Sequence, residues 1–374
     1  MPPRAEKTVP ARKPGALRPP AEIEYAAELA ALAAADKDPK PPGWKLSPGA
    51  VRSFLCGCDK PAVRQKFFGD DALVERVIVG LAGNRGVLLV GEPGTAKSML
   101  SELLTAAISG TSTNVIQGTA GTSEDQIKYS WNYALLLAEG PTPRALVASP
   151  LYAGMRDGTV VRFEEITRCP PEVQDSLVSV LSEKMMTVPE LSGDDRLLLA
   201  RPGFNVLATA NVRDRGVHEM SSALKRRFNF ETVAPIADRD MEIRLVAEEC
   251  ERLLKDAEAP VAVSRDVVEL LVTVFQDLRQ GVTAEGTQIE KPAAVMSTAE
   301  AVSVAMAAGL HAWYYGGRKL TGEHVGLHIA GAVLKDNPDD VKKLRHYFDV
   351  AVKPRAKQKA GAWEEFLKAR KQLR

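Results

Sequence analysis

The spacing of apolar positions divides the chain into two blocks. In the first block, short apolar runs alternate with helical patterns, an order that predicts a parallel α/β sheet. After Pro235 the apolar spacing is helical throughout, which predicts a separate all-helical domain. We expect strands at 87–90, 114–117, 159–163 and 204–209, and helices at 71–82, 97–109, 239–255, 265–279, 297–315, 321–334 and 339–351.

The first 47 residues precede this alternation. Residues 1–20 are rich in Pro and Ala and lack an apolar period, as in a disordered tail. Residues 21–35 have a short helical pattern that could dock on the body or on a partner. Ser47 and Pro48 then provide a helix cap and a first helical residue. The expected domains are a disordered basic tail with a short helix at 1–47, an α/β domain at 48–235, a helical lid at 236–352 and a basic C-terminal tail at 353–374.

Composition and charge narrow the class of protein. Of the 374 residues, 45% are hydrophobic and 26% are charged, as in an ordinary globular protein. Residues 1–20 carry a charge of +4 and residues 353–374 carry +6, so the net charge of +1 leaves −9 for the remainder. An acidic body does not suit a nucleic-acid groove, whereas the basic tails suit solvated ends and could also contact nucleic acid or an acidic partner.

Cysteine usage and hydropathy indicate the compartment. The four cysteines, at 56, 58, 169 and 250, make neither a disulfide framework nor a zinc-like pair of pairs. The apolar run at 26–35 contains Glu28 and is too short to span a bilayer, and no signal peptide is visible. We therefore expect a cytoplasmic protein without a membrane span.

The strongest chemical signal is "GVLLVGEPGTAKSML" at 86–100, a strand followed by a glycine-rich turn and Lys-Ser at the start of a helix. In such a loop the backbone N–H groups hold phosphates, Lys97 reaches the β- and γ-phosphates, and the Ser98 hydroxyl binds Mg²⁺. Ala96 replaces the usual last glycine; alanine can occupy helical φ/ψ, so it is tolerated if this residue already lies in the first helical turn. The candidate nucleotide-binding residues are Gly91, Glu92, Pro93, Gly94, Thr95, Ala96, Lys97, Ser98 and Met99.

Two adjacent acids end a later strand in "TVVRFEEITRCPP" at 159–171. They fall at the carboxyl edge of the predicted sheet, where α/β proteins bind ligands. We expect Glu164 to hold Mg²⁺ or its water, and Glu165 to polarise the attacking water. The usual pair is Asp-Glu, so Glu164 is a departure, and a pair of acids after a strand can also begin a solvated helix.

Two further polar signals follow. Asn211 ends the strand in "GFNVLATAN", where an amide can orient the lytic water or the γ-phosphate, or can serve only as a turn residue. Arg226 and Arg227 follow in "SSALKRRFNF". In a ring these two arginines could reach the nucleotide of a neighbouring subunit, and otherwise they are surface charge.

Taken together, "GEPGTAKSML", "FEEITRCPPEVQDSLVSVLSEK", "LATAN" and "ALKRRF" resemble the MoxR-like group of AAA+ ATPases over about residues 60–335. The resemblance implies Walker A at 91–98, Walker B at Glu164 and Glu165, with Glu165 as catalytic base, and sensor 1 at Asn211. It implies that Arg227 is an arginine finger acting on the next subunit, with Arg226 as its substitute. Ala96 fits, because loops of this group commonly carry alanine there. The resemblance also implies a P-loop AAA+ α/β fold with hairpin inserts, ATP and Mg²⁺ as cofactors, a hexameric ring, and a partner with a von Willebrand factor A domain.

Two inserted segments also match the resemblance, and one position in the predicted lid differs from the pattern of the family. "YALLLAEGPTPRALVASP" at 133–150 predicts a hairpin with a Gly-Pro turn, and "TVPELSGDDRLLLARPG" at 187–203 predicts a second hairpin. In similar proteins such loops engage substrate, so 135–137 and 197–199 are contact candidates unless they pack on the body. Thr298 and Ala299 stand where related lids carry a nucleotide-sensing arginine.

Three functions are therefore open. The first is a Mg²⁺-dependent ATPase ring that remodels or assembles a partner protein in the manner of a chaperone. The second is a nucleic-acid motor similar to the GTPase subunit of McrBC-type restriction systems, which would need a basic pore or a fused DNA-reading domain. The third is a slow ATP-binding scaffold or switch, an alternative that Glu164 and the missing lid arginine favour.

Overall fold

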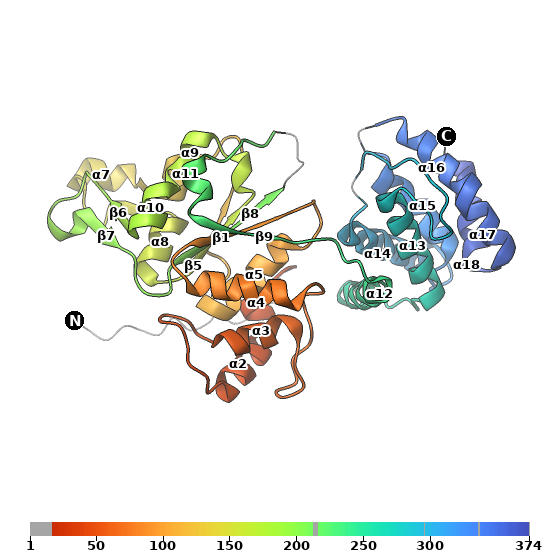
Figure 1. Cartoon of the computed structure of the whole chain (residues 1–374), viewed down its shortest axis with the longest axis horizontal. Coiled ribbons are helices and arrows are strands. Elements are labelled where there is room, and N and C mark those ends of the chain that lie inside the picture. Colours follow the sequence, from red (N-terminus) through yellow and green to blue (C-terminus); the bar gives the residue numbers. More distant parts are fainter. Residues whose placement is uncertain (1–16, 212–215, 295, 336, 374) are drawn as a thin grey trace. The chain divides into compact units, whose positions relative to one another are not determined.

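The computed structural model describes residues 17–211, 216–294, 296–335 and 337–373. The chain forms two compact units (Figure 1). One unit consists of Met1–Gly91 with Ala96–Val233, and the other of Glu92–Thr95 with Ala234–Arg374. None of the helices in the described part of the chain is long and apolar enough to cross a membrane.

A five-stranded parallel sheet forms the centre of the first unit (Figure 1). The strand order is β2 (Val115–Gln117), β5 (Val160–Glu164), β8 (Asn205–Asn211), β1 (Gly86–Gly91) and β9 (Phe228–Thr232). The four strands expected from the sequence are confirmed within one or two residues at their ends. The sequence pattern did not indicate β9, because this edge strand buries Phe228 but leaves every second residue exposed and follows directly on a polar, basic segment.

Helices cover both faces of the sheet because its strands are apolar on both sides. Val87 and Leu89 of β1 pack into one core with α3 (Pro48–Cys56), α4 (Asp71–Ala82) and α5 (Lys97–Ser109). Leu88 points to the other core, which includes α8 (Pro150–Asp157) and α10 (Leu177–Glu183). The short helices α9 (Pro171–Asp175) and α11 (Ser222–Lys225) complete this side. The sheet thus presents the carboxyl ends of β1, β5 and β8 at one edge.

The segment before Ser47, the N-cap of α3, packs onto the sheet unit. It contains α1 (Ala21–Glu24) and α2 (Ala26–Ala35), and Ala21 and Leu32 lie in the same core as α3 to α5. The buried Glu22 carboxylate accepts hydrogen bonds from the Ser112 N–H (3.0 Å) and hydroxyl (2.7 Å). The helix at 21–35 therefore docks on the body, and most of the predicted disordered tail lies outside the described residues.

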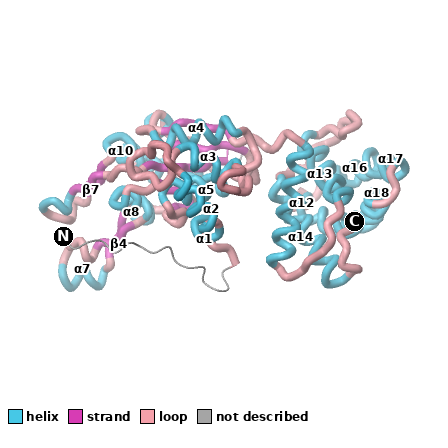
Figure 2. The backbone as a smooth tube through the Cα atoms, turned by 90° about the horizontal axis from the view of Figure 1, so that it is seen from below, coloured by secondary structure: helices cyan, strands magenta, loops and turns pink. Residues whose placement is uncertain are grey.

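Two inserts extend from the sheet, each with an antiparallel pair of strands (Figure 2). In the first insert, which begins with α6 (Glu124–Ile127), β3 (Tyr129–Trp131) and β4 (Leu146–Ala148) enclose α7 (Tyr133–Glu139). The expected simple hairpin at 133–150 is wrong, because the Asn132 side chain caps a helix by accepting the N–H groups of Ala134 and Leu135. In the second insert, β6 (Met185–Thr187) and β7 (Leu197–Leu199) form the expected hairpin.

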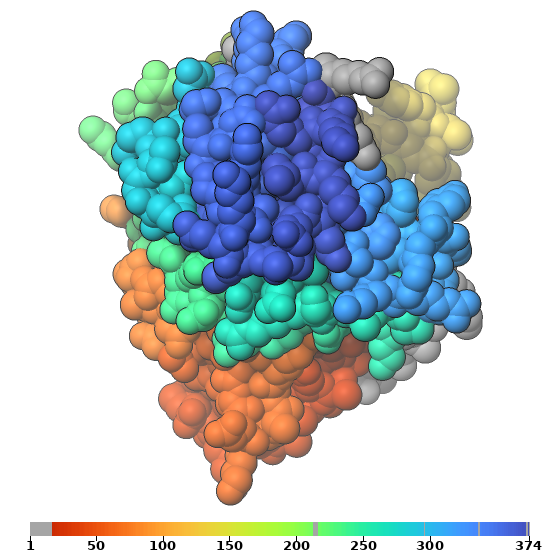
Figure 3. All heavy atoms as spheres, turned by 90° about the vertical axis from the view of Figure 1, so that its right-hand side faces the viewer, coloured from red at the N-terminus to blue at the C-terminus, as the bar shows by residue number. Residues whose placement is uncertain are grey.

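The second unit is helical, as expected. Its long helices are α12 (Arg239–Asp256), α13 (Arg265–Gln280), α14 (Thr298–Tyr315) and α15 (Gly322–Val333), followed by α16 (Asp340–Tyr347), α17 (Lys353–Gln358) and α18 (Ala362–Leu367). One apolar core joins all of them except α17. The C-terminal helices, in dark blue, cover a broad area of this unit in Figure 3.

The expected basic tail at 353–374 is wrong. Phe366 of α18 is fully buried and stacks on Phe348, with the ring centroids 4.8 Å apart. Arg355 of α17 is also buried, and its guanidinium donates to the Asp277 carboxylate at 2.7 Å. The net positive charge of 353–374 suggested a tail. Most of its basic side chains lie on the outer face of these helices, however, while the apolar residues share a buried inner face.

Candidate active site

The loop between β1 and α5 has the backbone of a phosphate cradle. Gly94 has φ +76°, a left-handed conformation that costs glycine little. Ala96, directly before α5, also lies in the left-handed region, with φ +63° and ψ +21°. Ala96 therefore lies outside the first helical turn, so the condition under which alanine is easily tolerated is not met, and its methyl group carries a steric cost of about 1–2 kcal/mol that glycine would avoid.

Lys97 begins α5 and is almost completely buried, with 7% of its surface exposed. Its Nζ donates to the carbonyl oxygen of Gly91 at 3.1 Å, which turns the side chain back over the loop. The loop N–H groups lie at the start of α5, where the helix dipole also favours an anion. Loop, lysine and helix together can hold the phosphates of a nucleotide.

Glu164, at the end of β5, is the centre of a buried hydrogen-bond network. Its carboxylate accepts from the hydroxyls of Ser98 (2.7 Å), Ser101 (2.5 Å) and Thr209 (2.8 Å). The Arg162 guanidinium, from the same strand, donates to it at 2.9 Å. Burial alone would raise the pKa of Glu164, but the hydrogen bonds from Ser101 and Ser98 and the charge of Arg162 bring it below its usual value. Glu164 is thus ionised at neutral pH.

These residues fit a magnesium site made jointly with nucleotide phosphates. The Ser98 hydroxyl donates a hydrogen bond to the Glu164 carboxylate, so the lone pairs of the Ser98 oxygen remain available to a cation. Glu164 supplies a fixed negative charge behind this hydroxyl. The described residues contain no group of three or more His, Cys, Asp or Glu side chains arranged for a metal. Mg²⁺ is usually bound by one or two protein groups together with substrate phosphates.

Glu165 follows Glu164 in a left-handed conformation, with φ +54° and ψ +46°. Its N–H donates to the Thr209 hydroxyl at 3.0 Å, so the turn is anchored to β8. Its carboxylate forms an ion pair with Arg168, at 2.9 Å from Oε2 to Nε. The turn directs the two neighbouring acids to different partners, Glu164 into the buried network and Glu165 to the more exposed Arg168.

Asn211 ends β8 and is the register partner of Gly91 in β1. The structure therefore places Gly91, Glu164 and Asn211 at the carboxyl ends of three neighbouring parallel strands. Residues 212–215, which follow Asn211, lie outside the described part of the chain.

Arg226 and Arg227 lie at the other end of the parallel strands, where β1 and β9 begin. They directly precede β9, which begins beside the first residue of β1, with Phe228 paired to Gly86. The phosphate loop begins at the other end of β1, about 16 Å away at the usual rise of a strand. The Arg227 guanidinium donates to the Ser182 hydroxyl (2.9 Å) and the Ala223 carbonyl (2.8 Å), whereas Arg226 is exposed. Neither arginine is placed to reach a nucleotide on its own chain.

The sequence reasoning missed four residues of this site: Arg162, Ser101, Thr209 and Arg168. One signal was present, because a charged residue within an apolar strand requires a buried partner. Arg162 interrupts such a run, and two residues later Glu164 faces the same side. Ser101 and Thr209 have ordinary polar side chains, and only the packing of α5 against β5 and β8 shows their role.

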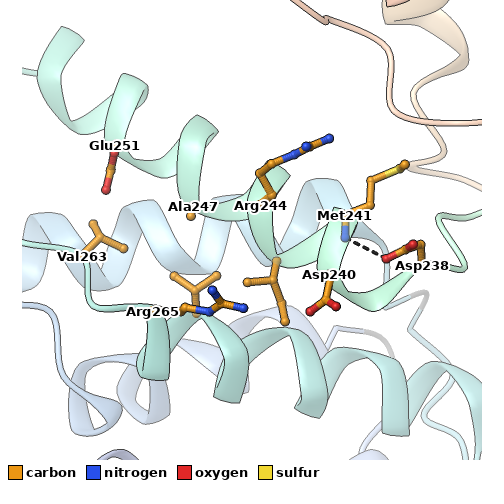
Figure 4. A pocket seen from close by; sticks show the side chains of 10 residues that line it. Asp238, Asp240, Met241, Arg244, Ala247, Glu251, Val263 and Arg265 are labelled. Atoms are coloured by element: carbon orange, nitrogen blue, oxygen red, sulfur yellow. Dashed lines mark hydrogen bonds between the residues drawn. The ribbon is translucent and has the colours of Figure 1, made fainter.

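A pocket in the helical unit has a different character (Figure 4). It lies between α12 and α13, has a volume of about 580 Å³, and is lined by acids such as Asp240 and Glu251 as well as by Arg244 and Arg265. Asp238 caps α12 there by accepting the Met241 N–H at 2.9 Å. Charges of both signs surround this pocket, so its lining does not favour an anionic ligand.

Comparison with known proteins agrees with this geometry. Residues 86–228 match the AAA domain of the dynein-related subfamily, and residues 240–374 match the C-terminal domain of YehL-like AAA+ ATPases. YehL of Escherichia coli strain K12 is 52% identical over 358 residues, which are 95% of this chain and 97% of that protein. Chaperone MoxR1 of Mycobacterium tuberculosis is 32% identical over 170 residues, 45% of this chain and 41% of MoxR1. The crystal structure of NtrX from Brucella abortus with ADP covers 81% of this chain and 68% of its own, at 11% identity and a TM-score of 0.49.

Proposed function

This chain belongs to the YehL-like AAA+ ATPases of the MoxR type, and from that premise we propose that it hydrolyses Mg²⁺-ATP in a hexameric ring that remodels or assembles a partner protein. ATP binding and ATPase activity are properties of this family. The metal, the ring, the partner and the residue roles are the proposed parts.

The residues divide the work of phosphoryl transfer as follows. The loop N–H groups and Lys97 hold the triphosphate, and the Ser98 hydroxyl, fixed by Glu164, would bind Mg²⁺. When bound, Mg²⁺ neutralises charge on the β- and γ-phosphate oxygens. Glu165 accepts a proton from the attacking water, and Asn211 orients that water or the γ-phosphate. Glu165 must leave Arg168 for this role, because the ion pair engages its Oε2 atom.

One observation supports the proposal that the chain acts as a ring-shaped oligomer. The phosphate loop and the two arginines lie at opposite ends of β1, so Arg226 or Arg227 could stabilise the transferring phosphoryl group only on the nucleotide of a second copy. The expected result is a specific ATPase activity that rises with protein concentration in step with assembly, measured by sedimentation. Full activity of a monomer that lacks both Arg226 and Arg227 would refute the ring.

The inserts support action on another protein. Leu137 and Tyr133 of α7 are 89% and 73% exposed, and Leu199 of β7 is 61% exposed. Exposed apolar side chains on projecting inserts are typical of a protein-binding surface. Capture with a Glu165→Gln protein, which should bind ATP without cleaving it, is expected to retain a protein with a von Willebrand factor A domain. Recovery of nucleic acid in its place would favour the motor alternative.

The scaffold alternative has one observation in its favour, the ion pair between Glu165 and Arg168. If this pair only limits the rate, Arg168→Ala should raise the turnover number. A wild-type turnover as low as that of Glu165→Gln, unchanged by Arg168→Ala while ATP still drives assembly, would establish the slow scaffold.

A further inference from the structure

A small cationic pocket lies beside the two arginines in the first unit. It has a volume of about 240 Å³ and is lined by Asn84, Arg85, Leu181, Ser182, Lys184, Arg226 and Arg227. The lining includes four basic residues and no acidic one, in contrast to the pocket of Figure 4. Residues from three separate segments meet here: the turn before β1, the end of α10 and the segment before β9. Such a concentration of positive charge favours an anionic ligand.

Lys184 is the most informative of these residues. Its Nζ is buried and has no hydrogen-bond partner among the residues that the structure describes. It lies 5.6 Å from the centre of the Phe204 ring, and burial lowers the pKa of its ammonium group. An ammonium group without an acidic partner is costly to bury, so a native structure that keeps one requires an explanation. An anion that enters the pocket would supply the missing partner.

The neighbouring arginines are arranged for the same ligand. Arg227 is held in place by its hydrogen bonds to Ser182 and Ala223. Arg226 and Arg85 are exposed, so they can close on an incoming group. Planar guanidinium groups bind phosphate oxygens through paired hydrogen bonds, and lysine binds them as a point charge.

We propose that this pocket binds phosphate oxygens of a nucleotide held by a second copy of the chain, with Lys184 as a phosphate-binding residue beside the two arginines. The proposal rests on the ring of the proposed function. It extends the contribution of the neighbouring subunit from an arginine pair to a built anion site. Inorganic phosphate or pyrophosphate, which have the same chemistry, can occupy the pocket in the isolated chain.

The first test examines the pocket without the chain's own nucleotide site. In a Lys97→Ala background, which weakens phosphate binding at the loop, millimolar pyrophosphate is expected to raise the melting temperature. Adding Lys184→Met should remove that increase, and the exposed Lys37→Met should not. Lys184→Met alone should melt at a higher temperature than wild type in the absence of anions, because it removes an unpaired buried charge. A pyrophosphate effect that persists in Lys97→Ala/Lys184→Met would overturn the site.

The second test distinguishes a neighbour's nucleotide from free phosphate. Lys184→Met is expected to lower kcat about tenfold to a hundredfold, with KM and nucleotide affinity nearly unchanged. Mixing it with Lys97→Ala should restore activity, because the Lys184→Met subunit keeps its own nucleotide site and receives the intact pocket of its neighbour. Pyrophosphate binding without a kcat defect, or a defect that mixing does not repair, would limit the pocket to free anions acting within one chain and refute the proposal.

Failure of this inference can be separated from failure of the ring. If wild-type activity depends on assembly and on Arg226 or Arg227, but Lys184→Met turns over normally, the ring stands and the lysine has no role in it. If wild-type activity is independent of concentration and of both arginines, the ring itself is wrong, and the pocket proposal is refuted with it.

Discussion

At the scale of single residues, the candidate site depends on hydrogen bonds between side chains from different elements. Glu164 accepts hydrogen bonds from Ser98, Ser101, Thr209 and Arg162 at once, so several donors fix its carboxylate. Its additional methylene, compared with the aspartate usual at this position, lets the carboxylate reach these donors. Glu164 thus places a fixed negative charge beside the Ser98 hydroxyl, as the proposed magnesium site requires.

Ala96 offers a direct test of the loop backbone. Ala96→Gly should stabilise the first unit by about 0.5–1 kcal/mol, because relief of about 1–2 kcal/mol of left-handed strain exceeds the added flexibility of the unfolded chain. Ala31→Gly, at an exposed position within α2, should instead destabilise by about 0.5–1 kcal/mol. Equal losses in the two variants, measured by urea unfolding, would show that Ala96 is unstrained.

At the scale of elements, the C-terminal helices belong to the core of the helical unit. Phe366→Ala should cost about 3–5 kcal/mol, as for a large buried aromatic side chain. The nearby Lys371→Ala, an exposed change, should stay within about 0.5 kcal/mol of wild type. Circular dichroism in urea measures both. A negligible effect of Phe366→Ala would restore the tail interpretation.

The attachment of α17 should also respond to acid. The Arg355 guanidinium donates to Glu285 at 2.6 Å and lowers the pKa of this carboxyl to about 2 from an ordinary 4.5. The stabilisation is present above pH 4.5 and is lost as the pH falls from 4.5 towards 2. The melting temperature should therefore fall more steeply over this range in wild type than in Glu285→Gln. Because Glu285 is 57% exposed, the difference should be small. Identical acid profiles would contradict the pairing.

At the scale of the whole molecule, the phosphate loop and the two arginines proposed to act on a second copy lie at opposite ends of β1. The exposed Arg226 and the tethered Arg227 should then contribute differently. Arg226→Ala should lower kcat about a thousandfold while nucleotide affinity is retained. Arg227→Ala should have a smaller effect if it mainly shapes the pocket. The reverse ranking in steady-state kinetics would identify Arg227 as the finger, as the sequence resemblance implies.

The sequence by itself determined the phosphate loop, the strand ends that carry Glu164 and Asn211, and most of the helix bounds. These features arise from local periodicity, caps and glycine positions, which act over a few residues. Only the tertiary structure decided that Ala96 is left-handed, that Arg162 and Ser101 donate hydrogen bonds to Glu164, and that 353–358 and 362–372 form helices of the second unit. Those outcomes depend on contacts between distant segments, and residue type and spacing along one segment do not specify them.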